Sequence, residues 1–285
     1  MFFQRVSIVG LGLLGSSWAL ALKENAFSGL VRGCDRPEVL ERALALALIN
    51  EAEEDPAEAV RDADLVILAM PVQAILDLLP NLEPAVSPHA LVTDVGSTKR
   101  LICERAEQVF HGRSLFLGGH PMAGKARSGL EHAEASLFRN ARYVLVPLNP
   151  DHLLDERVRA FSALLTELGA LPFVTDAATH DRAVAFLSHL PQLISTGLAS
   201  LIAEESTEFL PLEFAGPGFR DLTRLAESPY PLWHDICTTN VDNIEAALAS
   251  LIQKLDNMRL HLGDSELEHD FKKALETRER LRSLR

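Results

Sequence analysis

Short apolar runs alternate with segments of helical spacing over roughly the first 175 positions of the chain. Continuous apolar runs of this kind are typical of strands buried within a parallel sheet. Between the runs lie segments rich in helix formers, including one over 37–49 that opens on a proline suited to a first helical turn. The pattern therefore predicts an α/β domain. The predicted strands cover residues 6–9, 30–35, 64–69, 91–95, 114–117, 142–146 and 171–174, with a helix over 151–168.

Beyond Thr175 the strand-like runs end and helix formers take over. A long apolar-rich segment over 180–205 contains Pro191, which lacks an N–H group and should kink the helix. Further on, residues 244–258 carry an apolar stripe at helical spacing. We therefore predict two domains: an α/β domain over 1–175 and an all-helical domain over 176–285.

Composition narrows the class of protein. The 285 residues are 47% hydrophobic and 24% charged, as in an ordinary soluble protein, and the net charge of −13 argues against nucleic acid as a partner. The apolar stretch over 6–22 falls short of the about 20 residues that a membrane span needs. Cys34, Cys103 and Cys237 have no CxxC spacing, which predicts no disulfide framework and no metal site. We expect a cytoplasmic protein without a membrane partner.

The first predicted strand runs into a glycine-rich turn that reads Gly10-Leu-Gly12-Leu13-Leu14-Gly15. In a dinucleotide-binding turn the first glycine permits the tight bend, the second lets the backbone approach a pyrophosphate and the third allows close packing of helix on strand. The helix that follows offers N–H groups at its N-terminus to the phosphates. The order of strand, turn and helix therefore predicts that 1–175 is a Rossmann-type domain and that these residues bind a dinucleotide cofactor, NAD.

Asp35 strengthens this interpretation, because it ends the second strand about 20 residues after the turn. An acid at this point accepts hydrogen bonds from the adenosine ribose and repels a 2′-phosphate, which favours NAD over NADP. Arg36 could partly offset the repulsion, so NADP stays possible. The alternative is a turn aspartate after an edge strand.

Two further segments leave the carboxyl edge of the predicted sheet, where ligands bind in open α/β folds. Met70, Pro71 and Val72 follow the strand over 64–69, and we expect them to border the cofactor. Ser97 follows the strand over 91–95 and is a candidate to face the nicotinamide. Its more common role would be the N-cap of the next helix.

His120 is the ionisable residue of the Gly/Pro-rich segment 118–124, which we expect to be the turn after the strand over 114–117. Taken alone, it could be a loop histidine that faces water. Its place at the same sheet edge makes it a candidate general base, because a neutral imidazole accepts protons near pH 7.

Three separated motifs resemble the prephenate and arogenate dehydrogenase family of tyrosine biosynthesis, and the likeness extends over most of the chain. They are GLGLLG over 10–15, DVGSTK over 94–99 and GGHPMAG over 118–124. The resemblance implies an oxidative decarboxylation: a ring alcohol gives a hydride to NAD, a ring carboxylate leaves as carbon dioxide, and the ring becomes aromatic. In that reaction His120 would accept the hydroxyl proton and Ser97 would hydrogen-bond the same hydroxyl. No metal is implied.

The same resemblance points to substrate-binding residues in the second half. His189 stands in an SHLP segment that lines the substrate pocket in that family, although alone it would be read as a core histidine. An arginine suits a dicarboxylate because its fork geometry matches a carboxylate. A Thr-Arg pair nine residues before Trp233 selects Arg224 rather than Arg220. Without the resemblance, Arg224 could equally form a surface salt bridge. Gln192 and Trp233 would complete the pocket.

Two departures leave the substrate open between prephenate and arogenate. Many prephenate-using relatives have a histidine where Gln192 stands and a glutamate where Ala126 stands. The resemblance also implies a homodimer built through the helical domain. No βαββαβ pattern follows, so we expect none of the ligand-sensing domains that some relatives carry. Alternative functions are another hydroxyacid dehydrogenase or imine reductase of the same two-domain build, or a non-catalytic NAD-binding or redox-sensing protein.

Overall fold

The computed structural model describes residues 2–110, 114–125, 127, 129–205 and 212–283. Its first half is an eight-stranded sheet in the order β3-β2-β1-β4-β5-β6-β7-β8. Neighbouring strands are parallel except β6 and β7, which are antiparallel. The strands are β1 (Arg5–Val9), β2 (Leu30–Cys34), β3 (Glu51–Glu53), β4 (Leu65–Leu68), β5 (Leu91–Asp94), β6 (Leu115–Pro121), β7 (Arg142–Pro147) and β8 (Leu171–Val174).

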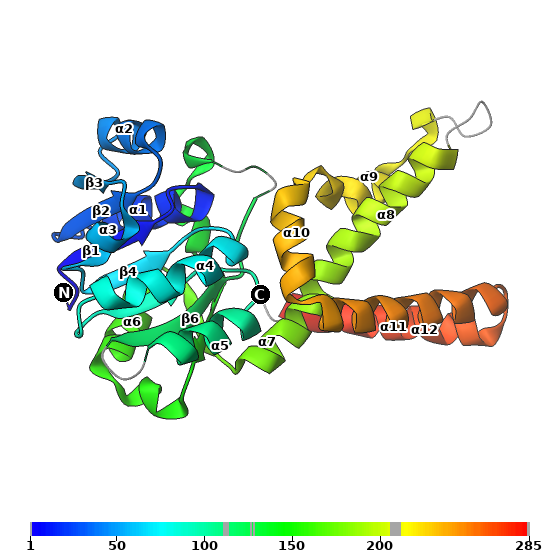
Figure 1. The fold of residues 1–285 in the computed structure, drawn as a ribbon. Helices are drawn as coiled ribbons and strands as arrows, with labels where there is room; N and C mark the ends of the chain where they lie inside the picture. Colours follow the sequence, from blue (N-terminus) through cyan, green and yellow to red (C-terminus); the bar gives the residue numbers. More distant parts are fainter. Residues whose placement is uncertain (1, 111–113, 126, 128, 206–211, 284–285) are drawn as a thin grey trace.

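Helices cover both faces of the sheet, and each face has its own apolar core (Figure 1). Trp18 lies at the centre of one core, fully buried and stacked on Phe161 at 5.9 Å between ring centroids. The first core packs under α1 (Leu13–Glu24), α2 (Pro37–Ala45) and α6 (Glu156–Glu167). The second packs under α3 (Pro56–Val60), α4 (Val72–Leu82) and α5 (Arg100–Val109).

Two predicted helices are shorter than expected. The helix predicted over 37–49 ends at Ala45, because Ala47 has a positive φ of 50° and turns the chain into β3. This edge strand has the sequence Glu-Ala-Glu and lacks the apolar run by which the other strands were predicted. The helix predicted over 151–168 is interrupted at Asp155, whose side chain accepts a hydrogen bond from the N–H of Arg157 and so starts α6.

The segment around His120 differs from the prediction in a way that affects the site. Strand β6 does not end at Leu117 but continues to Pro121, so His120 lies within a strand and not in a turn. The extension exists because β7 returns antiparallel and pairs His120 with Val144 and Pro121 with Tyr143. The imidazole is therefore held by sheet pairing rather than by a loop.

The second half is helical, as predicted. It contains α7 (Ala177–Val184), a π-helical turn (Ala185–His189), α8 (Leu190–Glu205), α9 (Pro217–Thr223), a 3₁₀ turn (Arg224–Glu227), α10 (Tyr230–Thr239), α11 (Val241–Leu260) and α12 (Ser265–Ser283). The irregular backbone expected near Pro191 is the π turn that immediately precedes it. Figure 1 shows α11 and α12 reaching away from the sheet as a long pair, joined by an ion pair between Lys254 and Asp270. The boundary at residue 175 stays a prediction.

One helical segment, 177–205, is long and apolar enough to cross a membrane by length and composition alone. Only 22% of the most apolar 18-residue stretch of this segment is buried within the chain. This segment is therefore an apolar surface on a single copy of the helical domain.

We predict that Trp18→Ala lowers the free energy of unfolding by about 3 to 5 kcal/mol, because it empties the centre of the first core. Denaturant unfolding measures the effect. The matched control is Leu154→Ala, whose side chain is 66% exposed and whose loss should change the stability by less than about 0.5 kcal/mol. Equal midpoints for the two variants would contradict the assignment of Trp18 to the core.

Candidate active site

The glycine-rich turn has the geometry that a dinucleotide needs. Gly10 has φ +95°, and a Cβ there would lie 2.4 Å from the carbonyl oxygen of Ala69, while a Cβ at Gly15 would lie 1.8 Å from the carbonyl oxygen of Gly10. At Gly12, in contrast, a Cβ would meet nothing within 4 Å, so this side of the turn is open. Gly12 is also the N-cap of α1, without a side-chain cap. The free N–H groups at the start of α1 therefore fit a phosphate.

Asp35 holds this turn in place. One carboxylate oxygen accepts the N–H of Leu11 at 2.6 Å, and the other accepts the N–H of Arg36 at 2.8 Å. A carboxylate has about four acceptor positions, so two remain for a ribose. The Arg36 guanidinium is 74% exposed and pairs with Glu38 at 3.2 Å. The sequence left two roles open for Asp35, ribose ligand or turn residue, and the structure shows its contacts to the backbone of the turn.

Met70, Pro71 and Val72 lie where predicted, between the end of β4 and the start of α4. Val72 is buried in the second core, while Pro71 is exposed. The N-terminus of α4 is contacted from the helical domain, because the carboxylate of Asp235 on α10 accepts the N–H of Gln73 at 3.2 Å.

A buried ion pair lies at the carboxyl end of β5. Lys99 and Asp94 contact each other through Nζ and Oδ2, and both side chains are fully buried. The other oxygen of Asp94 accepts the N–H of Gly119 at 3.0 Å. This pair therefore ties the loop that carries Ser97 to the strand that carries His120. Sequence reasoning missed both members, although a lysine and an aspartate that flank Gly-Ser-Thr at a buried strand end were a signal.

Ser97 is not the N-cap of the following helix. Helix α5 begins at Arg100, and its cap residue Lys99 makes no side-chain cap hydrogen bond. The carboxylate of Asp181, on α7, instead accepts the N–H groups of Lys99 at 2.7 Å and Arg100 at 3.0 Å. The more common role suggested for Ser97 is therefore wrong.

His120 is joined to a second histidine that the sequence analysis did not select. Its Nδ1 lies 2.9 Å from Nε2 of His180, and Nδ1 of His180 lies 2.7 Å from the carboxylate of Asp181. The pKa of His120 is held well below its usual value, chiefly because burial disfavours the imidazolium, and further because His180 and Lys99 lie near it. His120 is therefore neutral near pH 7 and able to accept a proton.

His189 is buried and hydrogen-bonded on one side of its ring. The side-chain amide of Asn240 donates to the carbonyl oxygen of Asp181 at 2.8 Å and contacts Nδ1 of His189 at 3.3 Å. Asn243 donates to the Asn240 oxygen, which fixes the amide with its NH₂ group toward His189. Nδ1 of His189 is then an acceptor, so the ring carries its proton on Nε2. Burial lowers the pKa of His189 to about 4, which keeps it neutral.

Trp233 packs edge-to-face on His189, with ring centroids 5.9 Å apart. Its indole Nε1 is buried and has no hydrogen-bond partner among the described residues. A buried donor without a partner costs free energy. This N–H is therefore available to a ligand oxygen.

Gln192 and Arg224 are linked through the backbone. The Gln192 amide donates to the carbonyl oxygen of Leu225 at 2.8 Å and to Oγ1 of Thr196 at 3.2 Å, so its NH₂ group is already used. Arg224 is exposed, and its guanidinium pairs with no other residue in the described ranges. Gln192 thus fixes the turn that presents Arg224. Ala126, the other departure from the family pattern, lies outside the described residues.

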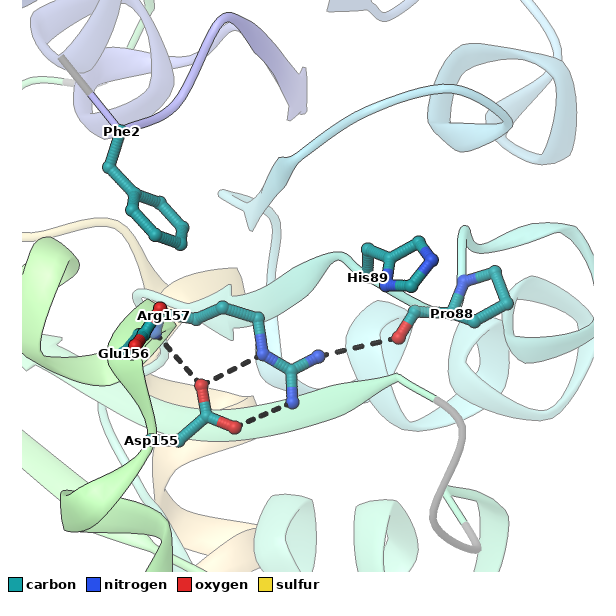
Figure 2. Close-up of a pocket in the computed structure, with 6 residues that line it drawn as sticks. All are labelled: Phe2, Pro88, His89, Asp155, Glu156 and Arg157. Carbon is teal, nitrogen blue, oxygen red and sulfur yellow. Dashed lines mark hydrogen bonds and ion pairs between the residues drawn. The ribbon is translucent and has the colours of Figure 1, made fainter.

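One hollow of the described structure lies away from this constellation. It has a volume of about 390 Å³ and lies at the amino edge of the parallel strands, opposite to the edge that carries His120. Figure 2 shows that Arg157 crosses it, paired with Asp155 and reaching the carbonyl oxygen of Pro88. The lining residues are Phe2, Pro88, His89, Asp155, Glu156 and Arg157.

A Rossmann-type sheet whose open glycine turn lies at the same edge as a neutral histidine, closed by a helical domain, defines a two-domain nicotinamide-dependent dehydrogenase. Residues 18–171 match the nucleotide-binding domain of prephenate dehydrogenase, and residues 176–277 match its dimerization domain. The chain belongs to the prephenate dehydrogenase family.

Individual relatives support the same family assignment. The chain is 34% identical to prephenate dehydrogenase of Bacillus subtilis over 94% of this chain and 72% of that protein. The Aquifex aeolicus prephenate dehydrogenase complex with hydroxyphenyl propionate and NAD+ superposes with a TM-score of 0.88, at 28% identity over 98% of both chains. Synechocystis arogenate dehydrogenase gives 0.81, at 32% identity over 97% of this chain and 99% of that one. The predictions of the family, the fold class, a dehydrogenase and NAD as its cofactor are confirmed.

We predict that Asp181→Asn lowers the free energy of unfolding at pH 7 by about 2 kcal/mol. Burial alone would raise the pKa of Asp181, but hydrogen bonds from His180, Arg100 and Lys99 lower it overall. The ionised carboxylate therefore stabilises the fold above the unfolded pKa of about 4, and this contribution is lost as pH falls below it.

Thermal or denaturant unfolding at pH 7, 5 and 3 checks this prediction. The difference between the native protein and Asp181→Asn should shrink toward pH 3. Asp55→Asn is the matched control, because Asp55 is itself exposed, caps helix α3 within one domain, and can be replaced by asparagine, which caps equally well. A pH-independent difference would show that the charge of Asp181 does not contribute.

Proposed function

We propose that this enzyme oxidatively decarboxylates prephenate, arogenate or both, with His120 as the general base. The observation that carries the proposal is the His120 ring: it is neutral, held in a strand at the carboxyl edge, and engaged through Nδ1 alone among the described contacts. Nε2 is therefore the atom that can accept the ring-hydroxyl proton. Ser97, whose hydroxyl caps no helix, is the proposed partner of the same hydroxyl.

The proton balance of the reaction fits a base that first takes a proton from the substrate and later returns it to the product. NAD, when bound, accepts the hydride from the ring carbon that bears the hydroxyl. His120 takes the hydroxyl proton as the carbon–oxygen bond gains double-bond character. The electrons of the broken bond to carbon dioxide then flow into the ring and onto that oxygen, which needs a proton to become the phenol. His120 returns it, so no net proton is released.

Carboxylate recognition is proposed for the helical domain. Arg224 supplies a guanidinium that has no partner among the described residues, and the buried N–H of Trp233 and the Nε2–H of His189 are neutral donors. Neutral donors bind a carboxylate without adding charge near a base that must stay neutral. We propose that Gln192 holds the turn that carries Arg224 through its hydrogen bond to the carbonyl oxygen of Leu225. The sequence predicted a direct contact with the substrate instead.

For the cofactor, we propose that Gly10, Gly12, Leu13, Leu14 and Gly15 surround the pyrophosphate. Asp35 would bind the ribose, and the segment 70–72 with Ser97 would border the nicotinamide. The open side at Gly12 and the uncapped N-terminus of α1 support this assignment. The carboxylate of Asp35 disfavours a 2′-phosphate, so NAD should be preferred to NADP. The Aquifex aeolicus relative was crystallised with NAD+.

We further propose a cytoplasmic homodimer built through the helical domain. The match to a dimerization domain and the apolar, mostly exposed surface of 177–205 support the dimer. Three free cysteines suit a reducing compartment. Large apolar side chains exposed on this domain include Phe186, Leu187, Leu201, Leu222, Val241, Ile252, Leu255, Phe271 and Leu275.

The decisive experiment follows NADH formation with prephenate and arogenate side by side, using NAD and then NADP. We expect turnover with at least one substrate, faster with NAD. His120→Asn should lower kcat by about a hundredfold to ten-thousandfold while NAD binding persists, because the base is lost but the nucleotide site is intact. Full turnover by His120→Asn would disprove the proposed base. Turnover of 3-hydroxy acids or cyclic imines, with no response to either cyclohexadiene, would favour the alternative dehydrogenases.

Arg224→Gln should raise KM for the cyclohexadiene substrate by about tenfold to a hundredfold and leave KM for NAD unchanged, because it removes one charged hydrogen-bond donor. Arg220→Gln, four residues earlier and equally exposed, is the matched control and should leave both values within about twofold. The assignment fails if the two variants behave alike. Steady-state kinetics with each substrate varied in turn provides the measurement.

A further inference from the structure

Three ionisable side chains from two domains form a hydrogen-bonded chain that the proposed mechanism does not yet use. Nδ1 of His120 lies 2.9 Å from Nε2 of His180, and Nδ1 of His180 lies 2.7 Å from Oδ1 of Asp181. The side chains of His180 and Asp181 are 1% and 0% exposed, so water does not compete for these contacts. The chain runs from strand β6 to helix α7.

The protonation of this chain can be worked out from its buried end. Both oxygens of Asp181 also accept backbone N–H groups, from Lys99 and Arg100, and these donors keep the carboxylate ionised. An ionised carboxylate only accepts hydrogen bonds, so Nδ1 of His180 must carry a proton. A neutral His180 then has its lone pair on Nε2.

That lone pair decides the tautomer of His120. The 2.9 Å contact is a hydrogen bond only if His120 carries its proton on Nδ1. Nε2 of His120 is then unprotonated, which is the form that accepts a proton from a substrate hydroxyl. Without such a partner, the ring could place its proton on either nitrogen, and one of the two tautomers cannot act as a base through Nε2.

We infer that His180 and Asp181 are positioning residues that set the tautomer of His120 and share the positive charge when it accepts the substrate proton. As Nε2 of His120 takes a proton, the Nδ1 proton moves along the hydrogen bond to Nε2 of His180, beside the Asp181 carboxylate. The reverse movement returns it when the phenol forms. No oxidant or co-reactant is needed. The inference rests on the proposed role of His120 as base.

The charged side chains beside the pair have partners of their own. Lys99 is paired with Asp94, and Arg100 with Asp242. Burial lowers the pKa of His189 to about 4 and raises the pKa of Tyr143 above its usual value. Burial also raises the pKa of the Cys103 thiol to about 12, so it stays neutral beside Asp181. The groups that act on the two histidines and Asp181 are thus Lys99, Arg100, Cys103 and His189.

The inference predicts a specific pH effect. A proton taken up by the resting pair resides on His180 next to Asp181, and doubly protonated His180 can no longer accept from Nδ1 of His120. His120 then turns to its other tautomer and loses activity as a base. The fall of kcat/KM at low pH, its acid limb, should therefore reflect the protonation of His180. A residue at position 180 that cannot take up a proton should move this acid limb to lower pH.

His180→Gln and His180→Phe test this in the full-length enzyme. The glutamine oxygen reaches about as far as Nε2 and accepts a hydrogen bond but cannot take a proton, while phenylalanine does neither. We expect kcat to fall about tenfold for glutamine and about a hundredfold or more for phenylalanine, with both KM values within about twofold. The acid limb should shift to lower pH in His180→Gln. His89→Gln, exposed at the opposite sheet edge, is the matched control and should change nothing.

A second measurement does not depend on turnover. In ¹⁵N-histidine-labelled enzyme at pH 8, NMR should show His120 protonated on Nδ1, with the signal assigned by its loss in His120→Asn. In His180→Phe a measurable share of the rings should carry the proton on Nε2. A native His120 protonated on Nε2 would overturn the inference, as would a His180→Gln enzyme with native kcat and acid limb. Failure to turn over either cyclohexadiene would instead refute the proposed function, while the NMR result would still decide the tautomer.

Discussion

The docking of the helical domain depends on carboxylates placed at helix N-termini of the sheet domain. Asp181 occupies the N-terminus of α5, and Asp235 reaches the N-terminus of α4. The unpaired N–H groups and the positive end of the helix dipole attract anions at such points. These helices start at the carboxyl edge, where ligands bind in folds of this type. These contacts between the two domains therefore lie beside the residues proposed for catalysis.

The same device recurs within the sheet domain. Asp35 accepts the N–H of Leu11 in the glycine turn, and Asp94 accepts the N–H of Gly119 beside the base. In a chain with a net charge of −13, several acidic side chains thus hold the main chain in place around the site. Lys99 neutralises one of them in the interior, where an unpaired charge would be costly.

Much of this organisation could be predicted from the sequence. The features that could not be predicted each have a physical reason. Apolar periodicity located the buried strands, and the spacing from the glycine turn to Asp35 identified the nucleotide domain. Strand β3 escaped because its Glu-Ala-Glu sequence has no apolar run. The end of β6 escaped because its pairing is supplied by β7. His180 and Asp181 escaped because they meet His120 only through tertiary structure, 60 residues away in sequence.

The amide of Gln192 is bonded to the carbonyl oxygen of Leu225, whereas the base is held by β6 and α7. The two ends of the site therefore have separate anchors. A substitution at position 192 would displace the turn that carries Arg224 and leave the histidine chain untouched. If Arg224 binds the substrate tail and His120 is the base, as proposed, substitutions near residue 192 could change substrate recognition in a lineage while the histidine chain stays constant.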